Sequence, residues 1–133
     1  SQPICGECEK CIDACPTKAI EEPFVVNANK CLAYHTLENR EEKLPENITK
    51  KMGNWIAGCD ICQEVCPWNN KDIPSTSDPE LQPSEWILNI TKKDALSWSD
   101  SQWKQNLNKS ALKRIKPWMW RRNLKSISSN HEN

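Results

Sequence analysis

The residues whose type and spacing favour chemistry are eight cysteines, all in the first half of this 133-residue chain. Four of them form the run C-x2-C-x2-C-x3-C-P, which ends at Cys15 and Pro16. Three more form the run C-x2-C-x3-C-P, which ends at Cys66 and Pro67. Cys31 stands alone between the two runs. Thiolates repeated at this spacing are typical of ligands to 4Fe–4S clusters.

The arrangement found in bacterial two-cluster proteins divides these cysteines into two sets. Three closely spaced cysteines surround one cluster, and the fourth cysteine of the run binds the other cluster. A symmetric second run would carry a cysteine three residues before Cys59, but that position is Ile56. Cys31 is the remaining thiol and completes the count. The predicted ligands are Cys5, Cys8, Cys11 and Cys66 for the first cluster, and Cys15, Cys31, Cys59 and Cys62 for the second.

Two other uses of the cysteines are the alternatives. Zinc sites are built from paired C-x2-C knuckles around one tetrahedral ion, whereas a run of three close cysteines favours a cluster. Disulfides need an oxidising compartment, and bridges between cysteines this close would form strained rings. We therefore expect two 4Fe–4S clusters in a protein of the reducing, cytoplasmic compartment.

The charged residues divide the chain into an acidic half and a basic half. Residues 1–66 carry 7 basic and 11 acidic side chains, and residues 67–133 carry 11 basic and 7 acidic, so the total charge is zero. This asymmetry indicates different tasks for the two halves. The 3 glycines exclude a Gly-rich phosphate loop. The lack of a long apolar run predicts no membrane-spanning helix and no membrane partner.

The pattern along the chain predicts an α+β fold that begins with a dicluster ferredoxin-like domain over residues 1–70. A short β-rich run is expected at residues 23–26. Residues 71–84 are rich in proline and small polar residues, which indicates an irregular linker. Residues 85–133 are predicted to form short antiparallel α-helices of the HEAT-like type, with the tryptophans in their core.

Local signals predict where these helices begin. Thr91 and Asp94 have the spacing of a capping box, in which each residue satisfies a backbone N–H near the other. A second helix is expected to start near Ser99, and another is expected over residues 110–115. Pro117 suits the first turn of the last helix, because a helix leaves that N–H without a partner.

A basic stretch covers the last two predicted helices. No acidic residue lies between Lys109 and Lys125. Such a stretch is either a solvated helix face or a surface that contacts the phosphates of a nucleic acid. Trp118 and Trp120 have a spacing that favours the core for at least one of them. The candidate RNA contacts are Lys113, Arg114, Lys116, Arg121 and Arg122.

Several segments of the sequence go beyond the cysteine spacing. They are residues 5–8, 14–20, 31–38, 58–69, 110–114 and 122–123. The most specific of them is GCDICQEVCPWN at residues 58–69. Over nearly the whole chain, these segments closely resemble the C-terminal portion of the epoxyqueuosine reductase family.

The resemblance implies a cobalamin-dependent oxidoreductase that reduces the epoxide of epoxyqueuosine, at the wobble position of certain tRNAs, to give queuosine. The two clusters would pass single electrons from an external donor to the cobalt. In that family the cobalamin domain and the acid that protonates the epoxide oxygen precede this portion. We therefore expect the chain to be a monomeric C-terminal fragment with no catalytic residue of its own, inactive alone. Its basic helices would help to hold the tRNA.

Cobalamin contacts from this chain are hypothesised at Ala33, Thr36 and Asp60, which lie close in sequence to predicted ligands of the second cluster. The family usually has a small polar residue two positions after the lone cysteine and an aliphatic residue four positions after it. This chain has Ala33 and His35 there. If that segment faces the corrin, its contacts differ in this chain.

Two other functions stay open at this point. A stand-alone dicluster ferredoxin would carry two symmetric four-cysteine motifs and no basic helical extension, whereas this chain has Cys31 and the extension. A reductive dehalogenase also pairs cobalamin with two clusters. Those proteins are typically exported and membrane-associated, and the basic helices do not suit them.

Overall fold

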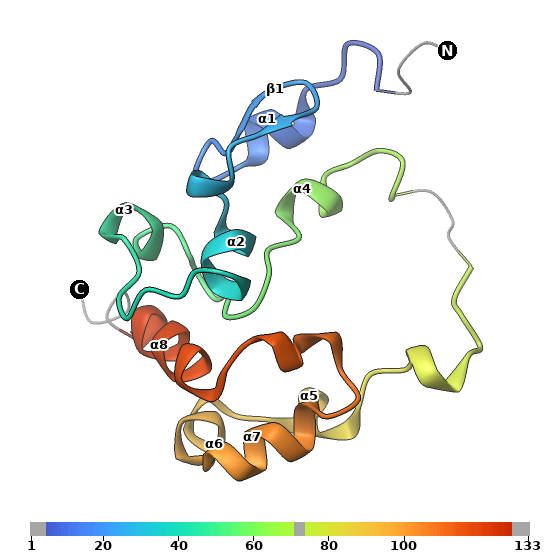
Figure 1. Cartoon of the computed structure of the whole chain (residues 1–133). Coiled ribbons are helices and arrows are strands. Elements are labelled where there is room, and N and C mark those ends of the chain that lie inside the picture. The colour runs from blue at the N-terminus through green and yellow to red at the C-terminus, as the bar shows by residue number, and fades with distance from the viewer. Residues whose placement is uncertain (1–4, 71–73, 129–133) are drawn as a thin grey trace.

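The computed structural model describes residues 5–70 and 74–128, and most regular structure in this part is helical (Figure 1). The helices are α1 (Lys10–Ala14), α2 (Leu32–Leu37), α3 (Glu46–Thr49), α4 (Ile61–Glu64), α5 (Glu85–Asn89), α6 (Lys92–Ser97), α7 (Asp100–Leu107) and α8 (Pro117–Ser128), with 3-10 turns at Ala28–Lys30, Pro79–Leu81 and Ala111–Arg114. The strands are β1 (Ile20–Glu22) and β2 (Val25–Val26). The α+β prediction is confirmed in a coarser form, as a mostly helical chain with one short two-stranded sheet. The HEAT-like arrangement stays a prediction.

The sheet is a small antiparallel hairpin that differs from the predicted single run at residues 23–26. Ile20 pairs with Val26 and Glu22 pairs with Val25, with an irregularity in the register between them. Phe24 has a φ of 67°, so the residues between the strands form a tight turn. Two strands therefore form where one was expected, because the turn falls inside the apolar run.

The second half begins its helices where the sequence predicted. The Thr91 hydroxyl accepts the Asp94 N–H at 3.1 Å, and the Asp94 carboxylate accepts the Thr91 N–H at 3.2 Å. Ser99 makes the same reciprocal cap for α7. Pro117 is the first residue of α8, as predicted. The segment near residues 110–115 forms a short 3-10 turn instead of an α-helix.

The core of the second half is built around stacked tryptophans. Trp103 and Trp120 are buried and stack with ring centroids 4.8 Å apart and an interplanar angle of 10°. Trp98 meets Trp103 edge-on at 4.8 Å. Trp118 is not part of this core and is 41% exposed, so of Trp118 and Trp120 only Trp120 is buried.

Helix α8 joins the two halves of the molecule. Its first turns pack on α6 and α7, and its end packs on the segment that precedes the second cysteine run (Figure 1). There Ile127 lies in a second core with Leu32, Ile48 and Met52. Among the described residues, no helix is both long and apolar enough to cross a membrane. Residues 1–4, 71–73 and 129–133 of the predicted domains lie outside the described parts, and the domain boundaries stay a prediction.

Candidate metal centre

The four cysteines predicted for the first cluster line one cavity of about 250 Å³. Helix α1 packs against α4, and this contact brings Cys66 to the loop of the first run. Cys5 and Cys8 are exposed, while Cys11 and Cys66 are half-buried. Lys10, Pro67 and Trp68 complete the lining. The first site therefore lies at the surface of the molecule.

The four cysteines predicted for the second cluster line a separate cavity of about 320 Å³. They come from three segments: Cys15 follows α1, Cys31 precedes α2, and Cys59 and Cys62 flank the start of α4. All four are half-buried. The structure thus brings together each set of four thiols that the spacing grouped.

The chemistry of this donor set fits clusters better than a single ion or disulfide bridges. All eight cysteines are free thiols. In the part of the chain that the structure describes, no three His, Cys, Asp or Glu side chains are grouped closely enough to hold one metal ion. A zinc ion needs its ligands around one centre, whereas a 4Fe–4S cluster spreads four thiolates over four iron atoms.

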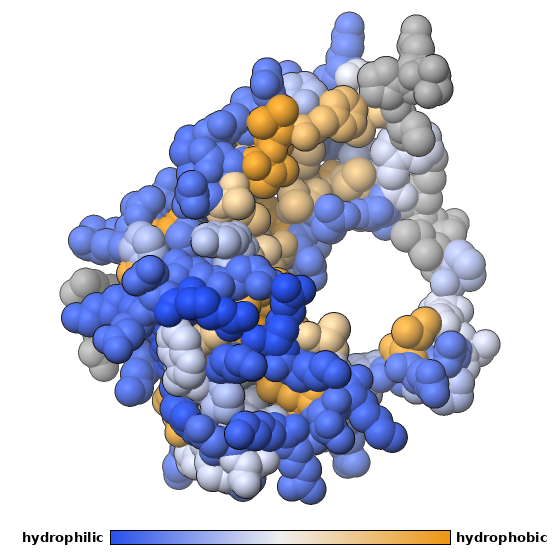
Figure 2. Space-filling model, in the orientation of Figure 1, coloured by the Kyte–Doolittle hydropathy of each residue, from blue (hydrophilic) through white to orange (hydrophobic). Residues whose placement is uncertain are grey.

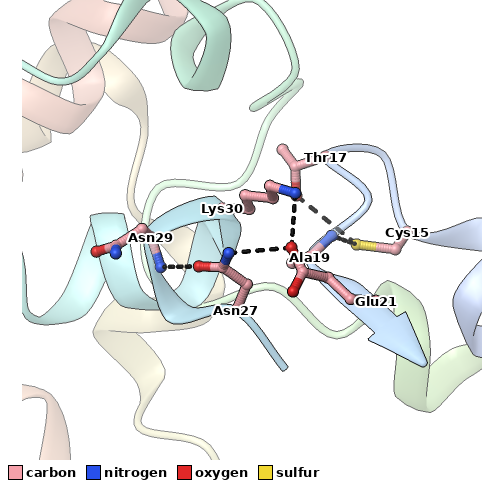
Figure 3. Close-up of polar contacts among 7 residues, drawn as sticks. All are labelled: Cys15, Thr17, Ala19, Glu21, Asn27, Asn29 and Lys30. Atoms are coloured by element: carbon pink, nitrogen blue, oxygen red, sulfur yellow. Dashed lines mark hydrogen bonds and ion pairs between the residues drawn. The ribbon is translucent and has the colours of Figure 1, made fainter. Parts of the chain in front are cut away.

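The surroundings of the second set change the acidity of its thiols in opposite directions. Burial, reinforced by the neighbouring thiols of Cys62, Cys31 and Cys15, raises the pKa of Cys59. Burial also acts to raise the pKa of Cys15, but hydrogen bonds to its sulfur from Ala19 and Thr17 outweigh burial, and the pKa is lowered. The Ala19 N–H donates to Cys15 Sγ at 3.2 Å (Figure 3). Hydrogen bonds to the charged form of a thiol favour that form.

An ion pair and hydrogen bonds connect the β1–β2 hairpin to the turn that precedes Cys31 (Figure 3). Lys30 Nζ pairs with the Glu21 carboxylate at 2.7 Å, and the Asn27 amide donates to the same oxygen at 3.0 Å. The Asn27 N–H donates to the Ala19 carbonyl at 2.8 Å. Ala19 therefore bonds to Cys15 on one side and to the turn before Cys31 on the other.

Comparison with known proteins also indicates a domain that binds two 4Fe–4S clusters. Residues 4–69 match the family described as the 4Fe–4S double cluster binding domain. The chain is 77% identical over 128 residues to an epoxyqueuosine reductase of Prochlorococcus marinus, covering 96% of this chain and 41% of that protein. The structure of the Bacillus subtilis epoxyqueuosine reductase superposes with a TM-score of 0.87 at 32% identity, over 98% of this chain and 34% of that one.

The chain is a homologue of the epoxyqueuosine reductases. It spans about two fifths of the length of the first curated relative. A further epoxyqueuosine reductase structure, solved with an epoxyqueuosine-modified tyrosine tRNA stem loop, has a TM-score of 0.86 and 32% identity, over 96% of this chain and 33% of that chain.

The residues considered for cobalamin contact lie in two different environments. Ala33 and Asp60 line the second cavity. Thr36 has no exposed surface. Its hydroxyl donates to the Leu32 carbonyl at 2.9 Å and accepts the Gly58 N–H at 3.0 Å. A corrin contact is therefore kept as a proposal for Ala33 and Asp60, because the Thr36 side chain is enclosed by protein.

The five basic residues considered for RNA differ sharply in exposure. Lys113 and Lys116 are exposed. Arg114 is also exposed and pairs with Glu38 at 2.7 Å. Arg121 is half-buried and pairs with Asp100 at 2.7 Å.

The structure does not agree with an RNA contact at Arg122, because this side chain is 8% exposed and faces the first half of the molecule. Burial, together with the nearby Arg40, lowers the pKa of its guanidinium. Arg122 lies three residues after the fully buried Met119, on the face of α8 that enters the core.

Proposed function

We propose that this chain is the electron-relay part of an epoxyqueuosine reductase and holds two 4Fe–4S clusters. The observation that carries the proposal is the pair of cavities, each lined by one complete set of four thiols. The ligands are Cys5, Cys8, Cys11 and Cys66 for the first cluster, and Cys15, Cys31, Cys59 and Cys62 for the second. The homology to epoxyqueuosine reductases and the match to a double cluster domain support the same assignment.

The residues of this chain have three tasks in that role. The thiolates hold iron, and the N–H of Ala19 stabilises negative charge on Cys15. Apolar side chains such as Leu32 and Ile61 line the second cavity and keep water from it. When bound, the clusters supply transfer of one electron at a time, at potentials set by hydrogen bonds to sulfur, charge and solvent exposure.

The two sites face different surroundings, which suggests the direction of transfer. Cys5 and Cys8 are exposed, so the first cavity offers a face that an external electron donor can approach. The second cavity is lined by Ala33 and Asp60 and adjoins the β1–β2 hairpin. The hairpin carries exposed apolar side chains, Phe24 among them, and Figure 2 shows apolar side chains gathered in this upper part of the molecule. We propose that Ala33 and Asp60 contact cobalamin held mainly by the rest of the enzyme.

The substrate assignment rests on the relatives. We propose that the whole protein reduces epoxyqueuosine to queuosine in tRNA using cobalamin, and that the basic residues of the second half contact the RNA. The solved relative with a modified stem loop supports an RNA partner. Among these residues we favour Lys113 and Lys116 as RNA contacts, since both are exposed. Arg114 and Arg121 remain candidates that already hold acidic partners.

The test is an assay of the whole protein that contains this chain, with reductant, cobalamin and a stem loop carrying epoxyqueuosine. We expect conversion to queuosine, and loss of conversion in the Cys31→Ala variant. Unchanged stem loop with the cluster-loaded wild-type protein would contradict the substrate assignment. Full conversion by the Cys31→Ala variant would contradict the electron-relay role of the second cluster.

A further inference from the structure

Helix α8 reaches the segments around the second cavity through two buried polar residues. Arg122 is 8% exposed and Asn123 has no exposed surface. Burying a polar group costs free energy unless its hydrogen bonds are made inside the protein. The partners of these two side chains therefore show what the burial achieves.

The Asn123 amide joins the two segments that carry three ligands of the second set. Its Nδ2 donates to the Thr36 carbonyl at 2.9 Å and to the Ile56 carbonyl at 2.8 Å. Thr36 lies in α2, which begins directly after Cys31. Ile56 lies three residues before Cys59. One side chain on α8 thus fixes the distance between these segments.

The Thr36 side chain adds a second tie at the same place. Its hydroxyl accepts the Gly58 N–H at 3.0 Å, and Gly58 is the neighbour of Cys59. Gly58 has a φ of 79°, a backbone conformation that glycine adopts without strain. The chain therefore turns into Cys59 at a point anchored to α2.

Arg122 supports the amide and caps α2. Its guanidinium donates to the His35 carbonyl at 3.1 Å and to the Asn39 carbonyl at 2.8 Å. It also donates to Asn123 Oδ1 at 3.0 Å, which leaves the Nδ2 of that amide facing the two carbonyls. The last carbonyls of an α-helix have no partner inside the helix, and here α8 supplies partners for two of those in α2.

We propose that Arg122 and Asn123 are positioning residues for the second cluster, holding the Cys31 and Cys59 segments at the separation the cluster requires. The proposal rests on the proposed function. In the described residues, the hydrogen bonds of these two side chains to other parts of the chain all go to residues 35–56. The segment that carries three of the four ligands of the first site takes no part in them, so we expect the larger effect at the second site.

The test is an Asn123→Asp variant, which keeps the oxygen that Arg122 binds and removes the donor to Thr36 and Ile56. After reconstitution with iron and sulfide, we expect iron to fall from about eight to about four per chain. The electron paramagnetic resonance signal of the first cluster should remain. Arg121→Ala is the matched control on the same helix, and it should keep about eight iron atoms.

A Thr36→Val variant keeps the side-chain volume and removes the hydroxyl, which accepts the Gly58 N–H and donates to the Leu32 carbonyl. We expect it to retain both clusters with a shifted reduction potential for the second one. In the iron-free protein, the Gly58 amide should exchange its hydrogen faster than in the wild type.

The outcomes separate this proposal from the proposed function. About eight iron atoms and unchanged signals and potentials in both variants would overturn the positioning role, and so would equal loss of both clusters. A wild-type protein that takes up no pair of clusters would instead overturn the proposed function.

Discussion

The two cysteine sites repeat one motif but are supported in different ways. Three thiols of the first site come from one short segment of the chain, and two of them are exposed. The four thiols of the second site come from three segments and are half-buried. Local sequence largely builds the first site, whereas the second depends on a helix about sixty residues further along the chain. Repetition of a ligand motif therefore does not imply equal dependence on the rest of the fold.

The strongest test of this difference between the two sites is the Cys31→Ala variant. Removing a thiolate leaves one iron of the second cluster without its ligand, so we expect that cluster to be lost. Iron should fall from about eight to about four per chain, measured by colorimetric analysis of the reconstituted protein. Cys11→Ala is the mirror variant and should remove the first cluster instead. An iron count still near eight in Cys31→Ala would contradict the ligand assignment.

A Met52→Ala variant tests whether the second site depends on its core. Met52 is fully buried beside Leu32 and Ile127, and Cys59 packs against the same core. Truncating a buried methionine leaves a cavity, so the free energy of unfolding should fall by about 2–5 kcal/mol. Urea unfolding of the reconstituted protein measures the change.

The control for that variant is Leu88→Ala, in which the truncated side chain is 68% exposed. A surface change of this kind should alter the free energy of unfolding by less than about 0.5 kcal/mol. If both variants lowered the free energy of unfolding equally, the core around Met52 would contribute no more to stability than an exposed site does.

A Thr91→Ala variant examines the half of the molecule that lies apart from the cysteines. The Thr91 hydroxyl caps α6 by accepting the Asp94 N–H. Its loss should cost about 1 kcal/mol of stability in urea unfolding. The iron content should not change, and a drop in iron would show that the two halves are more tightly coupled than the contacts indicate.

The sequence predicted the two sets of thiols because cluster ligation depends on short-range spacing that can be counted along the chain. It predicted the capping box at Thr91 and the helix start near Ser99 for the same reason, since these signals involve neighbours within one turn. The orientation of Arg122 could not be predicted from its place in a basic stretch. That orientation depends on which face of α8 meets α2, and this is set by packing between distant segments.

The hairpin was also only partly predictable. An apolar run at residues 23–26 indicated β-structure, but the position of the turn within it depends on the pairing of Ile20 with Val26. The cobalamin hypothesis for Thr36 met a similar limit. The position of Thr36 close to Cys31 in the sequence suggested a contact with cobalamin, but its side chain on α2 is fully buried.

The smallest expected effect belongs to Glu21, at the surface beside the turn that leads to Cys31. Hydrogen bonds from Lys30 and Asn27 lower the pKa of this carboxyl below its ordinary value of 4.5. Its contribution to stability is therefore present above that value and is lost as the pH falls through the folded-state pKa. A Glu21→Gln variant should show a shallower loss of stability in acid than the wild type, measured by thermal unfolding across the acid range. Identical pH profiles would contradict this role.

The most direct measurement of the central claim is the iron and sulfide content of the wild-type protein after anaerobic reconstitution. Two sets of four thiols predict about eight atoms of each per chain and broad absorption near ~400 nm. About four iron atoms per chain, or a colourless protein that holds zinc, would contradict the assignment of two clusters.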